Sequence, residues 1–471
     1  MSEPVREPLQ ITLPSGLAEV LAGAREFSAA VLVGGCVRDA VLGEPPKDID
    51  VEVPGIDFDA LAQLLSGFGR VDLVGRAFGV VKLQLPGTDT VDFSVPRRDS
   101  KVGAGHRGFD VATDPTITPR AAAARRDFTL NALAWDPRTR QVIDYFGGLT
   151  DLRQRVLRHT SDAFPEDPLR VLRGMQLAAR FDLTGAPETL VLCRSIAGTF
   201  AELPRERVCA EWFKWAARAR VPSAGLRFLR ASGWIAHFPE LEALAGVEQD
   251  PIWHPEGDVW THTLHALDAL VTSPVWRAAD ERTRVVWSLA VLLHDAGKAS
   301  TTRHEVRNGI DRVVSPSHET VSEQLATVFL ARLGAPGWTV ERVLPLVTQH
   351  MAHLTCRTDR AVRRLARRLE PETIASLAVV IGADVAGRPP LPHDPPETLE
   401  DLLETAGRLQ LATQAPRPIL LGRHLLERGF APGPAMGEVL DEAFEAQLDG
   451  AFADLDGALA WLAARESGLE N

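Results

Sequence analysis

The stretch LVGGCVRDAVLGEPPKDIDVEV, residues 32–53, decides the fold expected for the first part of the chain. Its short apolar run ends at Gly34-Gly35 and is followed by a segment suited to a short helix. Because glycine has no Cβ, the backbone N–H groups at this helix start can approach a polyphosphate closely. Arg38 lies one helical turn further on, where its guanidinium could hold a phosphate in a bidentate manner.

The same stretch ends in a strand pattern that carries two acidic residues. Strand alternation places Asp48 and Asp50 on one face, while the apolar residues between and after them point to the other. Two carboxylates on one face repel unless a cation lies between them, and hard oxygen ligands with free positions suit Mg²⁺. Asp92, on a later predicted strand, is a candidate third carboxylate. The alternative is a solvent-facing acidic strand.

The length and composition describe an ordinary globular protein of several domains. The chain has 471 residues, of which 45% are hydrophobic and 24% charged. It contains no apolar run of the ~18 residues that a membrane span requires, and its first residues lack the pattern of a secretory signal. Its four cysteines are widely spaced, which disfavours a disulfide framework or a zinc ribbon. We expect a cytoplasmic protein without a membrane partner.

The charge is unevenly distributed along the chain. The net charge is −12, which argues against indiscriminate binding to nucleic acid, including DNA. However, residues 97–180 contain 15 Lys and Arg against 10 Asp and Glu, so this segment is basic and the remainder is acidic. This distribution is expected if a single cleft binds phosphates, although a solvated charged face would look the same.

The secondary-structure signals change near residue 150. Strand patterns at 50–53, 79–85 and 90–95 give way to helical periodicity, for instance at 164–181, 205–218 and 258–271. A proline-rich tract around 388–396 is expected to be a linker. The fold class is therefore α+β: a small mixed-sheet head followed by a long helical body. We expect four parts, with bounds 1–150 (head), 151–245 (neck), 246–390 (helical bundle) and 391–471 (tail).

The motifs of the head resemble a known family. The pattern GG-x-V-R-D followed by D-x-D is similar to the polymerase-β nucleotidyltransferase superfamily, and more narrowly to class II tRNA nucleotidyltransferases (CCA-adding enzymes) and bacterial poly(A) polymerases. Residues 125–132, RRDFTLNA, match a further element of that family. The resemblance implies that Arg126 contacts the triphosphate of CTP or ATP and that Asn131 supports the ribose or the fold.

A second matching element, EDPLRVLR at residues 166–173, resembles the nucleotide-selecting motif of these enzymes. A continuous helix would place Glu166, Arg170 and Arg173 on one stripe with Asp167 beside it. A carboxylate accepts from an exocyclic amine and an arginine donates to a ring nitrogen, so such a pair would admit cytosine and adenine and reject uracil and guanine. The resemblance implies that Asp167 and Arg170 are the base-reading pair, with Arg173 nearby. The alternative is an ordinary ion-paired helix.

Residues 97–109 form a basic, glycine-rich segment between these motifs. It is predicted to be a mobile loop, and it corresponds to the loop that helps this family's pocket switch from C to A. Its presence favours a full CCA-adding enzyme over a CC-adding one. The alternative is a disordered surface loop.

The helical body carries a second constellation, which resembles the HD phosphohydrolase domain. His262 is followed by His294-Asp295, then by His318, His350 and His353, and finally by Asp384. The resemblance implies that His262, His294, Asp295 and Asp384 hold a metal. Mixed imidazole and carboxylate ligands suit Ni²⁺, Mn²⁺, Co²⁺ or Zn²⁺ better than Ca²⁺. His265, His304 and His353 are expected to be bystanders.

These resemblances imply an enzyme that adds CCA to the 3′ end of tRNA from CTP and ATP by two-metal transfer. The HD-like part would add 2′,3′-cyclic phosphodiesterase, 2′-nucleotidase or phosphatase activity.

The tail segment 418–450 resembles a tRNA-holding motif, or else is a helix–turn–helix packing unit. Alternatives are a CC-adding, A-adding or poly(A) polymerase, and an HD hydrolase with a non-catalytic nucleotide-binding head. A non-catalytic RNA-binding protein is disfavoured by the charge of −12. The oligomeric state remains open.

Overall fold

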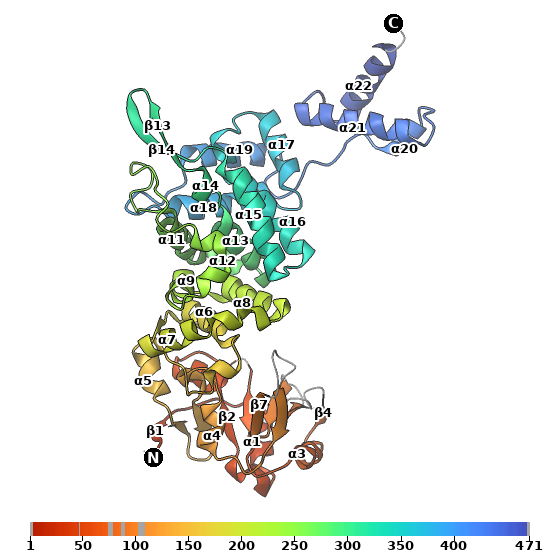
Figure 1. Cartoon of the computed structure of the whole chain (residues 1–471). Helices are drawn as coiled ribbons and strands as arrows, with labels where there is room; N and C mark the ends of the chain where they lie inside the picture. Colours follow the sequence, from red (N-terminus) through yellow and green to blue (C-terminus); the bar gives the residue numbers. More distant parts are fainter. Residues whose placement is uncertain (1–2, 47, 74–78, 86–89, 102–108, 469–471) are drawn as a thin grey trace. The chain divides into compact units, whose positions relative to one another are not determined.

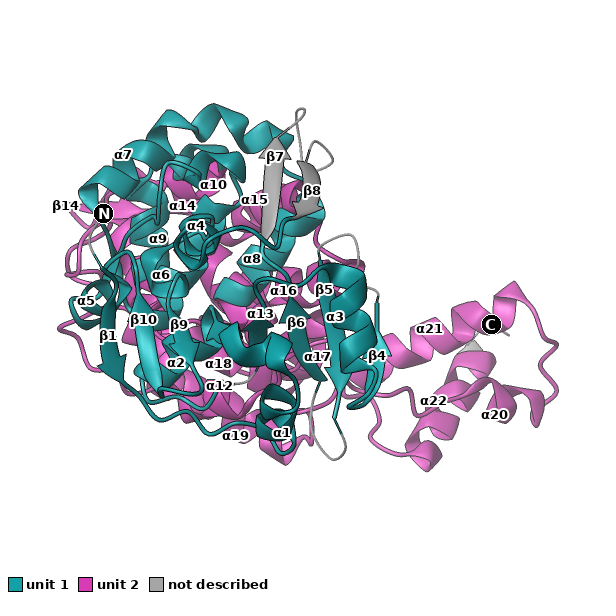
Figure 2. Ribbon diagram, turned by 90° about the horizontal axis from the view of Figure 1, so that it is seen from below, with its two compact units in different colours: residues 1–215, 224–237 teal, residues 216–223, 238–471 magenta. Residues whose placement is uncertain are grey.

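The computed structural model describes residues 3–46, 48–73, 79–85, 90–101 and 109–468 (Figure 1). The chain divides into two compact units, drawn in different colours in Figure 2. Unit 1 comprises residues 1–215 and 224–237, and unit 2 comprises residues 216–223 and 238–471. Within the described residues, no helix has both the length and the apolar character needed to cross a membrane.

An eight-stranded mixed sheet forms the centre of unit 1. Its spatial order is β1 (Val5–Pro8), β10 (Gln141–Asp144), β9 (Ala134–Asp136), β2 (Val31–Val33), β3 (Asp50–Glu52), β6 (Thr90–Ser94), β5 (Val80–Gln84) and β4 (Arg70–Asp72). Neighbouring strands are antiparallel except β3 and β6, which run parallel. The mixed sheet confirms the expected head.

The two faces of this sheet differ in chemistry because side chains alternate along each strand. Val51 of β3 and Val91 and Phe93 of β6 are buried in the apolar core, where Phe93 packs against Phe27 with ring centroids 6.0 Å apart. The intervening residues on the same strands are polar and only partly buried. The apolar face therefore anchors the strands, while the polar face is free to line a site.

Helix α2 (Gly35–Val41) begins directly after β2, as the glycine pair predicts. The other helices of unit 1 lie in the head or form the neck. They are α1 (Leu17–Ala22), α3 (Phe58–Leu65), α4 (Pro119–Ala124), α5 (Gly148–Arg153), α6 (Arg170–Phe181), α7 (Pro187–Ser195), α8 (Arg205–Arg218) and α9 (Pro222–Ala231), the last two also extending into unit 2.

The segment predicted as a mobile loop, residues 97–109, begins and ends in regular structure. β7 (Arg97–Lys101) and β8 (Phe109–Thr113) pair as an antiparallel ladder. The residues between these strands, 102–108, lie outside the described part of the chain.

The predicted helix over 164–181 is interrupted. A short 3₁₀ helix covers Phe164–Glu166, and α6 begins only at Arg170. Asp167 between them is extended, with φ −121° and ψ 99°. The cause is Pro168, because a proline ring disfavours the α conformation in the residue before it. Glu166 therefore does not share the α6 stripe with Arg170 and Arg173, contrary to the sequence-based expectation.

Unit 2 is almost entirely helical, as predicted. Its helices are α10 (Pro239–Glu242), α11 (Val259–Thr272), α12 (Pro274–Ala278), α13 (Glu281–Leu293), α14 (Lys298–Thr301), α15 (His318–Leu333), α16 (Gly337–Gln349), α17 (Asp359–Leu369), α18 (Ile374–Ala386), α19 (Glu397–Arg408), α20 (Gly422–Leu426), α21 (Pro434–Asp449) and α22 (Leu455–Gly468). A hairpin of β13 (Arg303–Arg307) and β14 (Ile310–Val314), missed by the sequence analysis, follows α14. The proline-rich tract separates α18 from α19, as expected of a linker.

Candidate active site

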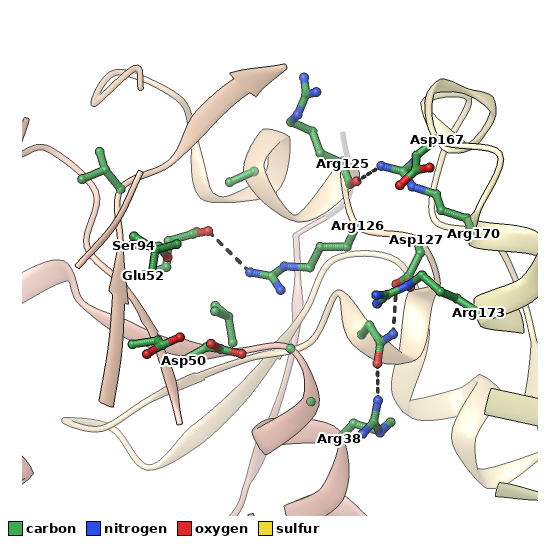
Figure 3. Close-up of a pocket in the computed structure, with 18 residues that line it drawn as sticks. Arg38, Asp50, Glu52, Ser94, Arg125, Arg126, Asp127, Asp167, Arg170 and Arg173 are labelled. Carbon is green, nitrogen blue, oxygen red and sulfur yellow. Dashed lines mark hydrogen bonds and ion pairs between the residues drawn. The ribbon is translucent and has the colours of Figure 1, made fainter. Parts of the chain in front are cut away.

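A cavity of about 470 Å³ opens on the polar face of the head sheet (Figure 3). It lies within unit 1, and we call it the head cavity. Most of the residues singled out in the head motifs line it. The lining residues are Val33, Gly34, Gly35, Arg38, Asp50, Glu52, Val80, Asp92, Ser94, Val95, Ala122, Arg125, Arg126, Asp127, Asn131, Asp167, Arg170 and Arg173.

One side of the head cavity is acidic. Asp50 and Asp92 are register partners on the parallel strands β3 and β6, and Glu52 follows Asp50 on the same face. Glu52 was not singled out from the sequence, although it continues the alternation of Asp48 and Asp50. Asp48 is exposed and does not line the cavity, so of the predicted metal carboxylates only Asp50 and Asp92 are brought together there.

The electrostatics of this acidic face favour a bound cation. Burial raises the pKa of Asp50 to about 6, the charges of Asp92 and Asp48 add to the rise, and Arg126 and Lys82 oppose it. Lys82 of β5 pairs with Asp92, its ammonium lying 2.8 and 2.7 Å from the two carboxylate oxygens. The surroundings of Asp50 therefore disfavour its charged form when no cation is bound. These oxygen donors fit Mg²⁺.

Gly34 allows an arginine to approach the start of α2. Its φ of 77° lies in the left-handed region that favours glycine. A Cβ at this position would be 3.0 Å from Arg126 Nη1 and 3.8 Å from Asp50 Oδ2. The guanidinium of Arg126 extends into the head cavity and makes a long contact with Glu52, at 3.5 Å (Figure 3). Arg126 is thus weakly held and open to an anionic ligand.

Arg38, in contrast, is engaged within the protein. It is buried, and its guanidinium donates to Asp39 Oδ1 from Nε at 2.8 Å and from Nη2 at 2.5 Å. Its Nη1 donates to Asn131 Oδ1 at 2.6 Å, as Figure 3 shows. These bonds use three of the five N–H groups of Arg38, so two remain for an anionic ligand in the cavity.

Asp127 links the same network to α6. Its carboxylate accepts from Asn131 Nδ2 at 2.9 Å and from Arg173 Nε at 2.8 Å. Burial acts to raise the pKa of Asp127, but the charge of Arg173 and the hydrogen bonds from Asn131, Arg173 and the Phe128 N–H outweigh it and hold this pKa low. Asp127 was not among the predicted site residues, although it belongs to the quoted RRD triplet.

The predicted base-reading residues line the cavity but are not paired with each other. Arg170 donates from Nη1 to the Ala163 carbonyl at 2.6 Å and from Nη2 to the Arg125 carbonyl at 2.7 Å, the latter drawn in Figure 3. Asp167 instead accepts from Arg207 of α8, with Nη2 and Oδ2 2.8 Å apart. An acidic and a basic side chain therefore line the cavity. Asp167 is bound by Arg207, and Arg170 is bound by two backbone carbonyls.

A second cluster of buried polar side chains lies inside unit 2. All four predicted metal ligands converge there: His262 of α11, His294 at the end of α13, the following Asp295, and Asp384 of α18. His262 Nε2 lies 3.1 Å from Asp384 Oδ1, and His294 Nε2 lies 3.3 Å from Asp295 Oδ2. We call these residues, with the two described next, the histidine cluster.

His318 and His350 complete the cluster, and the ligand set predicted from the sequence did not include them. Their Nε2 atoms lie 3.1 Å apart, and His318 Nε2 is 3.2 Å from Asp295 Oδ1. The Nδ1 atoms of both rings lie within 2.8 Å of backbone carbonyl oxygens, those of Ser315 and Val347. Each Nδ1 therefore donates to a carbonyl, and each ring turns its Nε2 into the cluster.

The cluster fits a cation by the chemistry of its donors. His262 Nε2, His294 Nε2 and Asp295 Oδ2 are buried and make no hydrogen bond of good geometry, although Lys298 Nζ lies 2.8 Å from Asp295 Oδ2. Burial and the neighbouring His294 lower the pKa of His350 to about 3, which keeps its lone pair available. Glu256, also missed from the sequence, accepts from His262 Nδ1 at 2.8 Å and orients that ring.

The mixed sheet, the acidic strand edge and the cavity define the first unit as a nucleotidyltransferase head. Residues 30–158 match the model of the poly A polymerase head domain. The chain is 38% identical over 369 residues to the multifunctional CCA protein of Xylella fastidiosa strain 9a5c, a match that covers 76% of this chain and 83% of that protein. It is 35% identical over 432 residues to the multifunctional CCA protein of Halorhodospira halophila, covering 87% of this chain and 94% of that one. The chain belongs to this family, the class II CCA-adding enzymes.

Solved structures show the same fold along nearly the whole chain. The Bacillus stearothermophilus CCA-adding enzyme in complex with CTP superposes with a TM-score of 0.65 at 21% identity, covering 97% of this chain and 99% of that one. The Thermotoga maritima CCA-adding enzyme complexed with tRNA superposes with a TM-score of 0.60 at 18% identity, covering 99% and 100%. These comparisons confirm the predicted family and fold class.

Proposed function

We propose that this protein builds the CCA end of tRNA from CTP and ATP in the head cavity. The observation that carries the proposal is that one cavity is lined both by the acidic edge of β3 and β6 and by a carboxylate and a guanidinium, those of Asp167 and Arg170. A transferase that selects its nucleotide needs both features within the reach of one bound nucleotide. Membership of the CCA-adding family indicates that the product is a CCA end.

The acidic edge supports the chemistry of transfer. Asp50 and Asp92 would hold Mg²⁺, with Glu52 beside them, and Asp48 would contribute its charge from the exposed strand end. When bound, Mg²⁺ would neutralise charge on the attacking 3′-hydroxyl and the departing pyrophosphate. The N–H groups at the start of α2, after Gly34, together with Arg126, would hold the triphosphate. No covalent intermediate with the protein is required.

The other side of the cavity supports base selection. Asp167 offers carboxylate acceptors, and Arg170 retains N–H donors beyond the two that bind backbone carbonyls. Cytosine and adenine both present an amine donor beside a ring-nitrogen acceptor, whereas uracil and guanine present the reverse. Asp167 and Arg170 would therefore leave buried groups unpaired against uracil or guanine, which is a strong form of rejection. Arg173 supports this side through its bond to Asp127.

The histidine cluster supports a second, hydrolytic activity. Its buried and convergent ring nitrogens and carboxylate oxygens favour a transition metal such as Ni²⁺, Mn²⁺ or Co²⁺. His262, His294, Asp295 and Asp384 would hold it, with His318 and His350 facing Asp295 from the other side. When bound, such an ion would activate water toward a phosphoester. A 2′,3′-cyclic phosphodiester, a 2′-phosphomonoester or another phosphomonoester fits this chemistry.

The product of a single reaction tests the head proposal. The protein is incubated with Mg²⁺, CTP, ATP and a tRNA that ends before CCA, and the 3′ end is sequenced. Addition of C-C-A followed by arrest is expected. Addition of C-C alone or of a lone A would identify a partial enzyme, a long A tail would identify a poly(A) polymerase, and absence of addition by folded protein would reject the proposal.

A further inference from the structure

The carboxylate of Asp167 is held on both of its oxygens by groups outside the base-reading pair. Oδ1 accepts from the backbone N–H of Leu169 at 3.2 Å, and Oδ2 accepts from Arg207 Nη2 at 2.8 Å. A carboxylate bound through one oxygen can still rotate about its last torsion, whose energy profile is broad. Bonds to both oxygens fix its plane. Each oxygen keeps a lone pair for a further donor.

Arg207 reaches Asp167 from another element. It lies in the first turn of α8, forty residues further along the chain, and it is not among the residues that line the head cavity. Within the described part of the chain, Asp167 is the side chain that accepts from its guanidinium. Arg207 is therefore placed to act on a bound nucleotide through Asp167, not by direct contact.

The bond between Arg207 and Asp167 matters because few neighbouring groups in the chain hold the Asp167 carboxylate. Pro168 keeps its backbone extended between two helices, so Asp167 is not part of a helix. Arg170, its functional partner, is directed toward the carbonyls of Ala163 and Arg125 and makes no bond to Asp167. The orientation of the acceptor thus depends on the Leu169 N–H and on Arg207.

We propose that Arg207 is a positioning residue for base selection: it fixes the plane of the Asp167 carboxylate so that this group accepts from the exocyclic amine of cytosine or adenine. The inference rests on the proposed role of Asp167 in the head cavity. A preorganised acceptor discriminates strongly between bases, because a mobile one can turn away from a wrong base at little cost.

Three variants test the proposal: Arg207→Ala, Arg207→Lys and, as a control, Arg205→Ala. Arg205 is exposed on the same helix, two residues away, and makes no bond to another described residue. For each variant, kcat and KM are measured for CTP, UTP, ATP and GTP on tRNA lacking CCA. The inhibition constant of inorganic tripolyphosphate is measured in parallel, because it reports on the phosphate subsite alone.

For Arg207→Ala, the preference for CTP over UTP and for ATP over GTP is expected to fall by about tenfold or more, since a hydrogen bond to a charged group is lost. KM for CTP and ATP should rise, while tripolyphosphate inhibition stays unchanged. Arg207→Lys should recover part of the selectivity, and Arg205→Ala should match the wild type. A general loss of structure would weaken tripolyphosphate inhibition as well.

Unchanged selectivity in Arg207→Ala would overturn the proposal, as would tighter binding of CTP, which would show that Arg207 masks Asp167. Asp167→Ala separates this failure from failure of the proposed function. If Asp167→Ala keeps its selectivity, Asp167 does not read the base. If Asp167→Ala loses selectivity and Arg207→Ala does not, only the positioning role is wrong. The double variant should be no less selective than Asp167→Ala alone.

Discussion

Asp50 and Asp92 face each other as register partners on β3 and β6, the parallel pair within the eight-stranded sheet. Parallel register places both side chains on the same face, and Asp48, further back on the β3 side, adds its charge. Lys82 forms an ion pair with Asp92. It acts on Asp50 through its charge, which lowers the pKa of Asp50. This imbalance is the physical reason for expecting a divalent cation at Asp50.

Replacing Asp50 with Asn is expected to reduce nucleotide addition at least ~100-fold, because a charged ligand at the site of transfer is lost. Phosphoester hydrolysis by the histidine cluster should remain, since the cluster lies in the other unit. Both activities are measured on the same preparation, and Asp162→Asn, an exposed change in unit 1, is the control. Loss of both activities in a folded Asp50→Asn variant would contradict the two-site interpretation.

Replacing Lys82 with Met is expected to lower the Mg²⁺ concentration that gives half-maximal nucleotide addition. Lys82 places a positive charge 2.7 Å from Asp92, and its removal leaves that carboxylate unpaired. Because the lysine is partly exposed, the gain should be limited to about fivefold. The measurement is a Mg²⁺ titration at saturating CTP. A higher requirement for Mg²⁺ would show that Lys82 positions Asp92 for the metal and does not compete with it.

Replacing Gly34 with Ala is expected to raise KM for CTP and ATP together, without changing the ratio between them. The new Cβ would lie 3.0 Å from Arg126 Nη1 and displace a group proposed to hold triphosphate. Gly43→Ala is a matched control, because Gly43 has nearly the same φ, 76°, but no atom within 4 Å of an added Cβ. Both variants should lose folding free energy, and Gly34→Ala the more, because the ψ of Gly34, −134°, lies outside the region that L-residues adopt at positive φ. Equal effects on KM would mean that backbone strain, and not Arg126, is responsible.

Replacing Glu256 with Gln is expected to weaken metal retention by the histidine cluster about tenfold, because a charged acceptor behind His262 is lost. The metal content after dialysis against a chelator and the hydrolysis of a 2′,3′-cyclic nucleotide are measured. Glu248→Gln, which alters an exposed carboxylate that bonds His304, is the control. CCA addition should not change in either variant. Full metal retention by Glu256→Gln would show that His262 needs no carboxylate to orient it.

The local motifs predicted much of the head and four of the residues that converge in the histidine cluster, because each motif spans only a few residues. The glycine pair begins a helix and the alternation around Asp50 forms a strand, both as expected. The helix predicted across Asp167 failed because the restriction that Pro168 places on the preceding residue outweighed helical periodicity.

Contacts between distant residues could not be predicted in the same way. His318 at the start of α15 and His350 at the end of α16 join the histidine cluster through the packing of separate helices, and their order in the chain does not show that both face Asp295. Arg38 shows the reverse case: its position after the glycine pair is as expected, but its donors are directed at Asp39 and Asn131.

The sequence by itself determined the mixed α+β head and many of the residues that line the head cavity, because strand alternation and glycine conformation act over a few residues. The class of protein followed from the resemblance of its motifs to a known family. Only the tertiary structure decided which charge meets which: Lys82 with Asp92, Arg173 with Asp127, and Arg207 with Asp167. These pairs are separated by 10 to 46 residues along the chain, and an ion pair depends on the distance between atoms, which packing sets.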